Sequence, residues 1–247
     1  MTASDFPAPA LHGGPDALGV PLHDFSTNSN ACGPCPGTWA AVQQADATRY
    51  PDPRYTALRA QLAAFHGVDP ERVLVAGSAS ECIFRITAWA ARQGVRQVQL
   101  PLHAYGDYRQ AAQAWGLAVH CGAPGPGAAP QEATLSWACE PSSPLGQTPA
   151  DLADWAAHCA PGLGVLDRDY APLRLSGVPA LAPAARGAVW QLFSPNKALG
   201  LTGVRVAYAI APRQAQAAVA QLEALSPSWP LGAHAVALLA SWCQADT

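Results

Sequence analysis

The sequence predicts an α/β protein built on a mostly parallel, doubly wound sheet that helices cover on both faces. Its 247 residues, half of them hydrophobic by type, are enough for one sizeable domain. From residue 72 onward, apolar runs of three to seven residues alternate with Ala-rich stretches of helical length. Continuous apolar runs are typical of strands that are buried on both faces, and their alternation with helices indicates parallel connections.

The predicted elements follow one another along the chain. An amphipathic helix over 55–66 comes first, with Leu58, Leu62 and Phe65 on one face. Pro149 and Asp151 suit the first turn of a later helix. The expected strands cover 73–75, 98–100, 117–119, 133–138, 164–166, 188–193 and 204–210. The expected helices cover 81–93, 108–115, 149–159, 213–225 and a segment that begins near 229.

The start of the chain differs in composition from the rest. Residues 6–36 are rich in Pro, Gly and Asn, which predicts an extended N-terminal arm over 1–36 and one large domain over 37–247. A second stretch of low complexity, 122–130, is expected to form a Gly/Pro/Ala loop.

Composition argues against several classes of function. The 14 basic and 17 acidic residues give a net charge of −3, so the chain lacks the basic field that a non-specific nucleic-acid binder needs. No apolar stretch approaches the roughly 20 residues that span a bilayer, so no membrane segment is expected. The first nine residues hold no basic residue and no apolar core, which argues against a signal peptide and favours a cytoplasmic protein.

The seven cysteines predict free thiols rather than a disulfide framework, because their number is odd and they are scattered. Cys32 and Cys35 form a Cys-Gly-Pro-Cys motif like that of thioredoxins, in which a strand delivers the first thiol to a helix N-terminus. No predicted strand precedes them closely, so we interpret the motif as a Gly/Pro turn. The other cysteines supply no second pair with zinc-site spacing, so no metal is expected.

A single lysine, Lys197, stands among the 14 basic residues. It directly follows a predicted buried strand, and Gly200, Gly203 and Arg205 come next. A lysine at a strand end can act as a Schiff-base amine when its neighbours lower its pKa. The alternative interpretation is an ordinary surface lysine.

A carboxylate lies at the end of another predicted strand. Asp167 follows the strand over 164–166 and precedes Tyr170 by three residues. Ligands of α/β sheets bind beyond the carboxyl ends of the strands, where a buried carboxylate needs a cation or a donor. A pyridinium nitrogen is one such cation. A turn or helix cap is the alternative role for Asp167.

Seven short motifs occur in order along nearly the whole chain, at 24–28, 49–53, 77–81, 105–108, 141–146, 167–170 and 194–205. Together they resemble the fold-type-I class I/II aminotransferase family, whose cofactor is pyridoxal 5'-phosphate (PLP). Within that family the chain is most similar to threonine-phosphate decarboxylases and histidinol-phosphate aminotransferases. The resemblance implies the three-layer PLP-transferase large domain, a small-molecule substrate and a homodimer.

The resemblance also implies a role for each matching residue. Lys197 would hold PLP covalently and move protons at the substrate Cα. Asp167 would pair with the pyridine nitrogen, Tyr170 would bind the ring oxygen, and Tyr105 would stack on the ring face. The phosphate would lie at a helix N-terminus. Its implied ligands are Ala79, Ser80, Ser194, Asn196, Arg205 and, from the other subunit, Tyr50.

Further residues concern the substrate. His12, Gly13 and Asn28 would contact it, and the motif that begins at His12 favours the decarboxylase branch. Ser143 stands where the family usually has an Asn that binds the ring oxygen. The chain is expected to end before the small C-terminal domain of the family, which carries the arginine that binds the substrate carboxylate.

Three functions remain open. The preferred one is decarboxylation of threonine phosphate, a step towards the cobalamin side chain, and the alternative is transamination of the histidinol-phosphate type. The third is a truncated, non-catalytic remnant that binds the cofactor or a partner chain. Such a remnant is expected to expose apolar residues, for example Trp229, Leu231, Val236 and Trp242.

Overall fold

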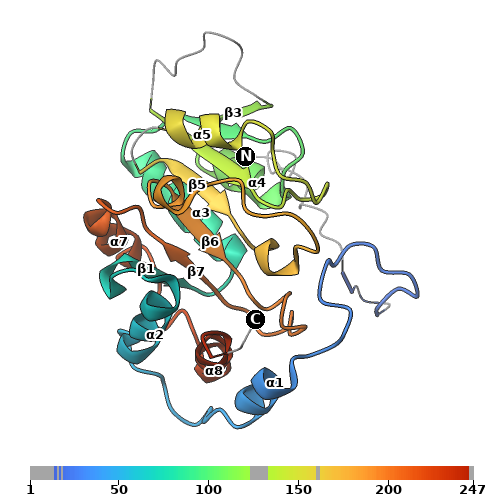
Figure 1. Cartoon of the computed structure of the whole chain (residues 1–247). Coiled ribbons are helices and arrows are strands. Elements are labelled where there is room, and N and C mark those ends of the chain that lie inside the picture. The colour runs from blue at the N-terminus through green and yellow to red at the C-terminus, as the bar shows by residue number, and fades with distance from the viewer. Residues whose placement is uncertain (1–13, 16, 18, 123–132, 160–161, 245–247) are drawn as a thin grey trace, which may run out of the picture.

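The computed structural model describes residues 14, 15, 17, 19–122, 133–159 and 162–244. In this part of the chain a seven-stranded sheet forms the centre of the molecule (Figure 1). β7 runs antiparallel to both of its neighbours, and the other adjacent pairs are parallel, so the predicted mostly parallel sheet is confirmed. In spatial order the strands are β1 (Val73–Ala76), β7 (Ala207–Ile210), β6 (Trp190–Phe193), β5 (Gly164–Asp167), β4 (Thr134–Cys139), β2 (Gln97–Leu100) and β3 (Ala118–Cys121).

Helices cover both faces of the sheet. Successive residues of a strand point to opposite sides, so a strand of apolar residues presents apolar side chains on both faces, and each face needs a covering layer. In β1, Leu74 and Ala76 join one core, whereas Val73 and Val75 join the other. The first core includes residues of α3 (Ala79–Arg92), α4 (Gly106–Ala114) and α7 (Gln216–Glu223). The second includes residues of α1 (Pro36–Gln43), α2 (Thr56–His66) and α8 (Ala233–Trp242). The three-layer α/β architecture is therefore confirmed (Figure 1).

Smaller elements complete the described structure. A third, small core includes residues of α5 (Leu152–His158) and α6 (Pro183–Arg186). Two 3₁₀ helices, η2 (Pro70–Arg72) and η3 (Ala171–Leu173), lie just before β1 and shortly after β5. Among the described helices, none is both long enough and apolar enough to cross a membrane.

The structure corrects two details of the sequence prediction. The last strand begins at Ala207 rather than at 204, because the side chains of Ser194 and Asn196 donate to the carbonyl groups of Val206 and Val204. Those carbonyls therefore belong to a braced loop. Phe65 is 40% exposed although the rest of its predicted face is buried; it lies in the last turn of α2, and its ring contacts Trp242 at the margin of the second core.

The apolar surface expected of a truncated remnant is largely absent around α8. Leu231 and Trp242 are both buried in the second core, where α8 packs against α1 and α2. Trp229 does remain 40% exposed. Val236 is half-buried, so the expected exposure was wrong for Leu231 and Trp242 and is met in part at Trp229 and Val236.

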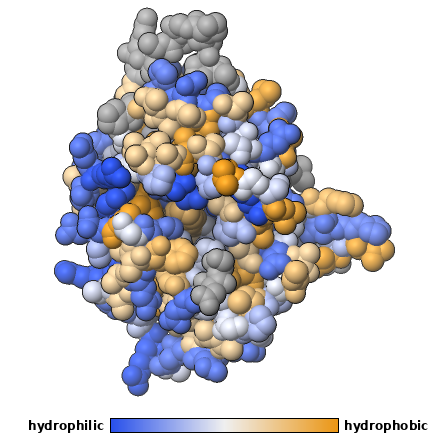
Figure 2. Space-filling model, in the orientation of Figure 1, coloured by the Kyte–Doolittle hydropathy of each residue, from blue (hydrophilic) through white to orange (hydrophobic). Residues whose placement is uncertain are grey.

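The N-terminal arm leads into a helix that the sequence did not predict. Apart from an isolated bridge residue at Gly19, the described residues of 14–35 adopt neither helix nor strand. This segment projects from the body of the molecule, with polar and apolar residues side by side on its surface (Figures 1 and 2). α1 then begins at Pro36 and packs on α8, where the hydroxyls of Thr38 and Ser241 lie 2.9 Å apart. The division into arm and domain at residue 36 stays a prediction.

Candidate active site

Lys197 lies in a run of hydrogen-bonded turns directly after β6, as the sequence predicts. Its side chain is 27% exposed, and its Nζ donates to Oδ2 of Asp169 at 3.0 Å. The same Nζ lies 4.8 Å from the centroid of the Tyr170 ring. Burial alone would lower the pKa of Lys197, but the negative charge of Asp169 and the neighbouring Tyr170 raise it above its ordinary value. In this state the amine is held as an ammonium ion.

Asp167 ends β5 and is buried at the carboxyl edge of the sheet. The hydroxyl of Tyr108 donates to its Oδ2 at 2.5 Å, and the backbone N–H of Asp169 donates to its Oδ1 at 2.9 Å. Burial raises the pKa of this carboxyl group, although both hydrogen bonds act in the opposite direction. Among the described residues, no cationic side chain lies within salt-bridge distance of Asp167. A donor or cation from a ligand would therefore complete its surroundings.

Tyr105 forms an aromatic wall beside these carboxylates. It precedes the first residue of α4, and its hydroxyl lies 3.2 Å from that of Ser80. Its ring meets Tyr108 edge-on at 6.0 Å, and Tyr108 stacks on Trp137 at 4.6 Å. These two ring contacts fix Tyr108, whose hydroxyl binds Asp167. Tyr105 itself is partly exposed, and it lies close enough to Lys197 for the charge of that amine to act on its hydroxyl.

The N-terminus of α3 offers backbone donors at the same edge. Ser78 caps the helix by accepting from the N–H of Glu81 at 3.0 Å. The backbone N–H groups of Ala79 and Ser80 make no hydrogen bond to another described residue. Free N–H groups at a helix N-terminus, together with the helix dipole, favour an anion such as a phosphate.

Ser194 and Asn196 brace the loop that carries Lys197. The Ser194 hydroxyl lies 2.8 Å from Oδ1 of Asn196 and 3.0 Å from the carbonyl oxygen of Val206. The Asn196 amide donates to the carbonyl groups of Thr202 and Val204 at 3.3 and 3.4 Å. Both side chains therefore have partners within the loop, and their role as phosphate ligands stays a prediction.

Arg205 is exposed, close enough to Asp169 for its charge to act on that carboxylate. Ser143 follows β4, and its backbone N–H lies beside the thiol of Cys139. Cys139 is the residue of β4 that lies opposite Asp167 of β5 in the sheet register. These positions leave the predicted cofactor contacts of Arg205 and Ser143 untested.

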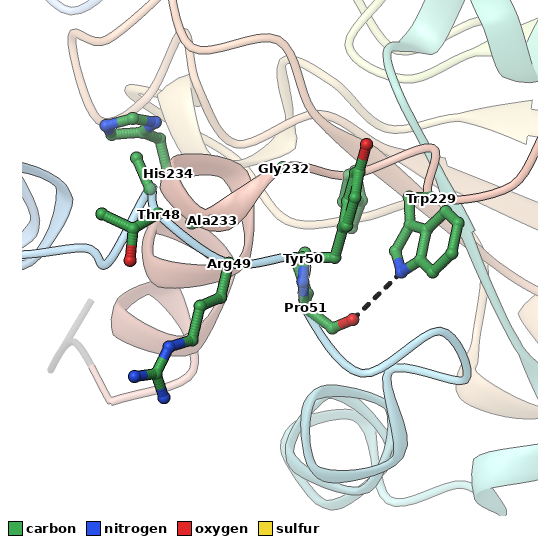
Figure 3. A pocket seen from close by; sticks show the side chains of 10 residues that line it. Thr48, Arg49, Tyr50, Pro51, Trp229, Gly232, Ala233 and His234 are labelled. Atoms are coloured by element: carbon green, nitrogen blue, oxygen red, sulfur yellow. Dashed lines mark hydrogen bonds between the residues drawn. The ribbon is translucent and has the colours of Figure 1, made fainter.

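Four predicted residues lie apart from this cluster or cannot be placed. Asn28 is exposed and makes no hydrogen bond to another described residue. Tyr50 is 77% exposed and stacks on Trp229 at 4.5 Å in an open pocket, where the indole donates to the carbonyl of Pro51 at 3.1 Å (Figure 3). His12 and Gly13 lie outside the described residues.

Sequence reasoning missed two residues of the site. Asp169, the second acid after β5, is the partner of Lys197. Asn30 binds the lysine loop, because its N–H donates to the carbonyl of Lys197 at 2.9 Å and its side-chain amide donates to that of Ala198 at 3.0 Å. The repeated Asn-x-Asn spacing at 28–30 is a signal in the sequence for Asn30.

The Cys32–Cys35 segment forms the Gly/Pro turn that the sequence predicts, with Gly33 at φ 88°. Both thiols are free, and the backbone N–H of Cys35 donates to the carbonyl of Leu199 at 3.0 Å. The turn therefore lies against the loop of Lys197. No cluster of three or more possible metal ligands occurs within the described ranges.

Comparisons with known proteins bear on this arrangement. Residues 21–123 match the family model for aminotransferase class I and II. Histidinol-phosphate aminotransferase 1 of Bradyrhizobium diazoefficiens is 32% identical over 228 residues, which cover 86% of this chain and 63% of that protein. Histidinol-phosphate aminotransferase of a Ruegeria species is 30% identical over 216 residues, which cover 77% of this chain and 56% of that protein.

Solved structures share the fold. Histidinol-phosphate aminotransferase from Sinorhizobium meliloti, in complex with pyridoxal-5'-phosphate, gives a TM-score of 0.74 at 20% identity and covers 88% of this chain and 62% of that one. L-threonine-O-3-phosphate decarboxylase from Porphyromonas gingivalis gives 0.73 at 21% identity, with 89% and 68% covered. The chain thus spans between about half and two thirds of the length of the curated relatives named above. By sequence and by fold it is a relative of the class I and II aminotransferases, as its ordered motifs indicate.

Proposed function

We propose that the chain binds PLP at Lys197 and forms part of a PLP-dependent enzyme of the aminotransferase family. One observation carries the proposal. The amine of Lys197, the carboxylate of Asp167 and the ring of Tyr170 converge beyond the ends of β5 and β6. The chain holds no other lysine that could bind the cofactor through an amine. The surroundings fit PLP, because Asp167 is buried with no cationic side chain of the described residues in salt-bridge contact. The protonated ring nitrogen of PLP would supply that cation.

The surrounding residues would hold the cofactor in a fixed orientation. Asp167, oriented by the hydroxyl of Tyr108, would pair with the ring nitrogen, whose positive charge would lower the pKa of this carboxyl group again. Tyr105 would lie against the ring face and Tyr170 would bind the ring oxygen. The N-terminus of α3 would bind the phosphate. Other candidate ligands are Ser143 for the ring oxygen, and Ser194, Asn196 and Arg205 for the phosphate.

Lys197 would carry the proton transfers. When bound, PLP supplies a ring that accepts electrons from the substrate Cα. The Nζ of Lys197 would then take a proton at the substrate Cα and return it. Its loop is suited to this role because Ser194 and Asn196 fix the backbone on one side and Asn30 fixes it on the other. A fixed amine meets the substrate in a reproducible geometry.

For the substrate we propose a phosphorylated amino acid or amine. The two curated relatives described above align with most of this chain and are named histidinol-phosphate aminotransferases, which supports transamination. Decarboxylation of threonine phosphate, towards the cobalamin side chain, is the second candidate. The motif at His12 and Asn28 favours it.

The proposal extends to assembly and location. Tyr50 would reach the phosphate in the other subunit of a homodimer, and its exposure away from Lys197 supports a role outside its own site. A cytoplasmic location remains part of the proposal, because scattered free cysteines suit a reducing compartment.

Covalent trapping tests the cofactor assignment. The chain is incubated with PLP, reduced with borohydride and analysed by peptide mass spectrometry. We expect one modified peptide, the one that contains Lys197. Lys197→Arg is the matched variant, since it keeps a positive charge beside Asp169 but removes the primary amine. An adduct of similar yield in this variant would refute the assignment.

Activity assays separate the three functions. Transfer of an amino group from histidinol phosphate to a 2-oxo acid supports the aminotransferase, whereas CO2 release from threonine phosphate supports the decarboxylase. PLP trapping without either reaction supports the non-catalytic remnant. Each assay is run on this chain and on the Lys197→Arg variant, whose residual rate gives the background.

A further inference from the structure

Asp169 makes a buried ion pair that sequence reasoning did not assign. It lies two residues after the end of β5, and its side chain is 4% exposed. Oδ2 accepts from Nζ of Lys197 at 3.0 Å, whereas Oδ1 is buried with no hydrogen-bond partner in the described structure. A buried carboxylate oxygen without a donor is costly. The stability of the fold therefore does not account for this carboxylate, which points to a role at the site.

A second carboxylate makes the position of Asp169 less favourable still. Asp167 lies at the same edge of the sheet, and its Oδ1 accepts from the backbone N–H of Asp169. Burial and the negative charge of Asp167 raise the pKa of Asp169 to about 7, while Lys197 and Arg205 act in the opposite direction. The described cation in direct contact with Asp169 is Lys197.

We propose that Asp169 is a positioning residue for Lys197, whose ammonium group it binds in the chain without cofactor and whose availability as a free amine it controls. The proposal deepens the PLP-binding function proposed above and rests on it for its biological meaning. An amine attacks an aldehyde only as the free base. Asp169 would thus set the pH range over which Lys197 reacts with an aldehyde cofactor.

The controlling step is a proton transfer along the existing hydrogen bond. One N–H bond of the Lys197 ammonium breaks and an O–H bond forms on the Asp169 carboxylate, so a charged pair becomes a neutral one. No electrons are exchanged and no further reactant is needed. A carboxyl group whose pKa burial raises is a better acceptor than an exposed aspartate.

Other titratable groups surround the pair and would remain in an Asp169 variant. Asp167 is the other carboxylate, and Arg205 is the other cation that acts on Asp169. The remaining groups are hydroxyls and thiols from four strands and helices and the loop after β5. They are Tyr105, Tyr108, Tyr170, Tyr208, Cys82 and Cys139. Burial raises the pKa of Tyr105, Tyr108, Tyr208, Cys82 and Cys139.

The single lysine allows a direct measurement. Reductive methylation with ¹³C-formaldehyde labels Lys197 and the N-terminal amine, and NMR then follows the Lys197 signal during a pH titration. In the parental chain we expect a midpoint above the ordinary lysine value of about 10.4. In Asp169→Asn we expect a midpoint lower by about one pH unit or more, because burial remains while its compensating charge is lost.

Two comparisons make the result decisive. Asp154→Asn, an exposed substitution on α5, should leave the Lys197 midpoint unchanged. Asp169→Ser provides a second variant with the same expected shift, should the Asn variant fold poorly. A midpoint equal to the parental one in a folded Asp169 variant would overturn the role of Asp169. Failure of borohydride trapping in the parental chain would instead overturn the proposed PLP function, because the titration uses no PLP.

Discussion

At Gly200 the loop of Lys197 packs closely against the backbone of the N-terminal arm. Its φ is 67°, in the left-handed region that residues with a Cβ rarely adopt. A Cβ at this position would lie 2.5 Å from the carbonyl oxygen of Gly33 and 2.7 Å from its carbonyl carbon. Both atoms belong to the backbone, so Gly200→Ala requires the arm and the loop to move apart.

The cost can be estimated from the contacts at this junction. The left-handed conformation alone costs an alanine about 1 kcal/mol. Separation of the two segments also weakens the hydrogen bonds from the N–H groups of Asn30 and Cys35 to the carbonyls of Lys197 and Leu199, each of which contributes about 1 kcal/mol. We therefore expect Gly200→Ala to lower the free energy of unfolding by about 2–4 kcal/mol.

Urea denaturation of two matched variants separates the contributions. Gly67→Ala has a similar φ of 63° but open space around the new Cβ, so it should show only the conformational cost of about 1 kcal/mol. Gly203→Ala meets nothing within 4 Å and has no positive φ, so its effect should stay within about 0.5 kcal/mol. A Gly200→Ala variant no more destabilised than Gly67→Ala would refute a steric contact between the loop and the arm. Slower PLP attachment to Lys197 should accompany the destabilisation, because the amine loses its fixed position.

Two further predictions concern buried hydrogen-bonded groups. Asp167→Asn should weaken PLP binding about 30-fold or more in a spectroscopic titration. Without PLP, Asp167→Asn should unfold at no lower temperature than the parent at pH 8. Because burial raises the pKa of the Asp167 carboxyl group in the folded state, its ionisation destabilises the fold as the pH rises above about 4, and an amide does not ionise. Tyr208→Phe should lower the free energy of unfolding by about 2 kcal/mol, because it removes the hydroxyl that lies 2.9 Å from Nε2 of His66 and accepts from Trp242 at 3.1 Å. Tyr50→Phe, at an exposed ring, should have no comparable effect. Equal stabilities of Tyr208→Phe and Tyr50→Phe would contradict the role of the Tyr208 hydroxyl. A lower unfolding temperature of Asp167→Asn at pH 8 would contradict the prediction for Asp167.

The sheet and the two central site residues could be predicted because local sequence determines them. A strand buried on both faces needs an unbroken apolar run, and Val165–Leu166 and Leu192–Phe193 supply one just before Asp167 and Lys197. In a parallel sheet the carboxyl ends of adjacent strands meet at one edge, so Asp167 at the end of β5 and Lys197 in the turns after β6 are expected to lie near each other.

α1 and the role of Asn30 could not be predicted in this way, because distant residues determine both. α1 carries no marked apolar stripe, and its packing depends on α8, about 200 residues later, through contacts such as Thr38 with Ser241. Asn30 binds the carbonyl of Ala198, which lies 168 residues along the chain. Spacing within a short segment carries no information on such a partner.

Asp169 is a different case, because the strand period did indicate its side. Side chains alternate between faces along extended backbone, so Asp167 and Asp169 lie on one side of the chain and Arg168 on the other. The structure agrees, since Arg168 lies 5.1 Å from the centroid of the Phe193 ring while both carboxylates face the site of Lys197. What the period cannot decide is which acid the amine binds. That choice depends on Tyr108, which already donates to Asp167 and leaves Asp169 as the carboxylate free to hold the ammonium. Its consequence is a division of roles: one acid is kept available for the ring nitrogen while the other holds the lysine.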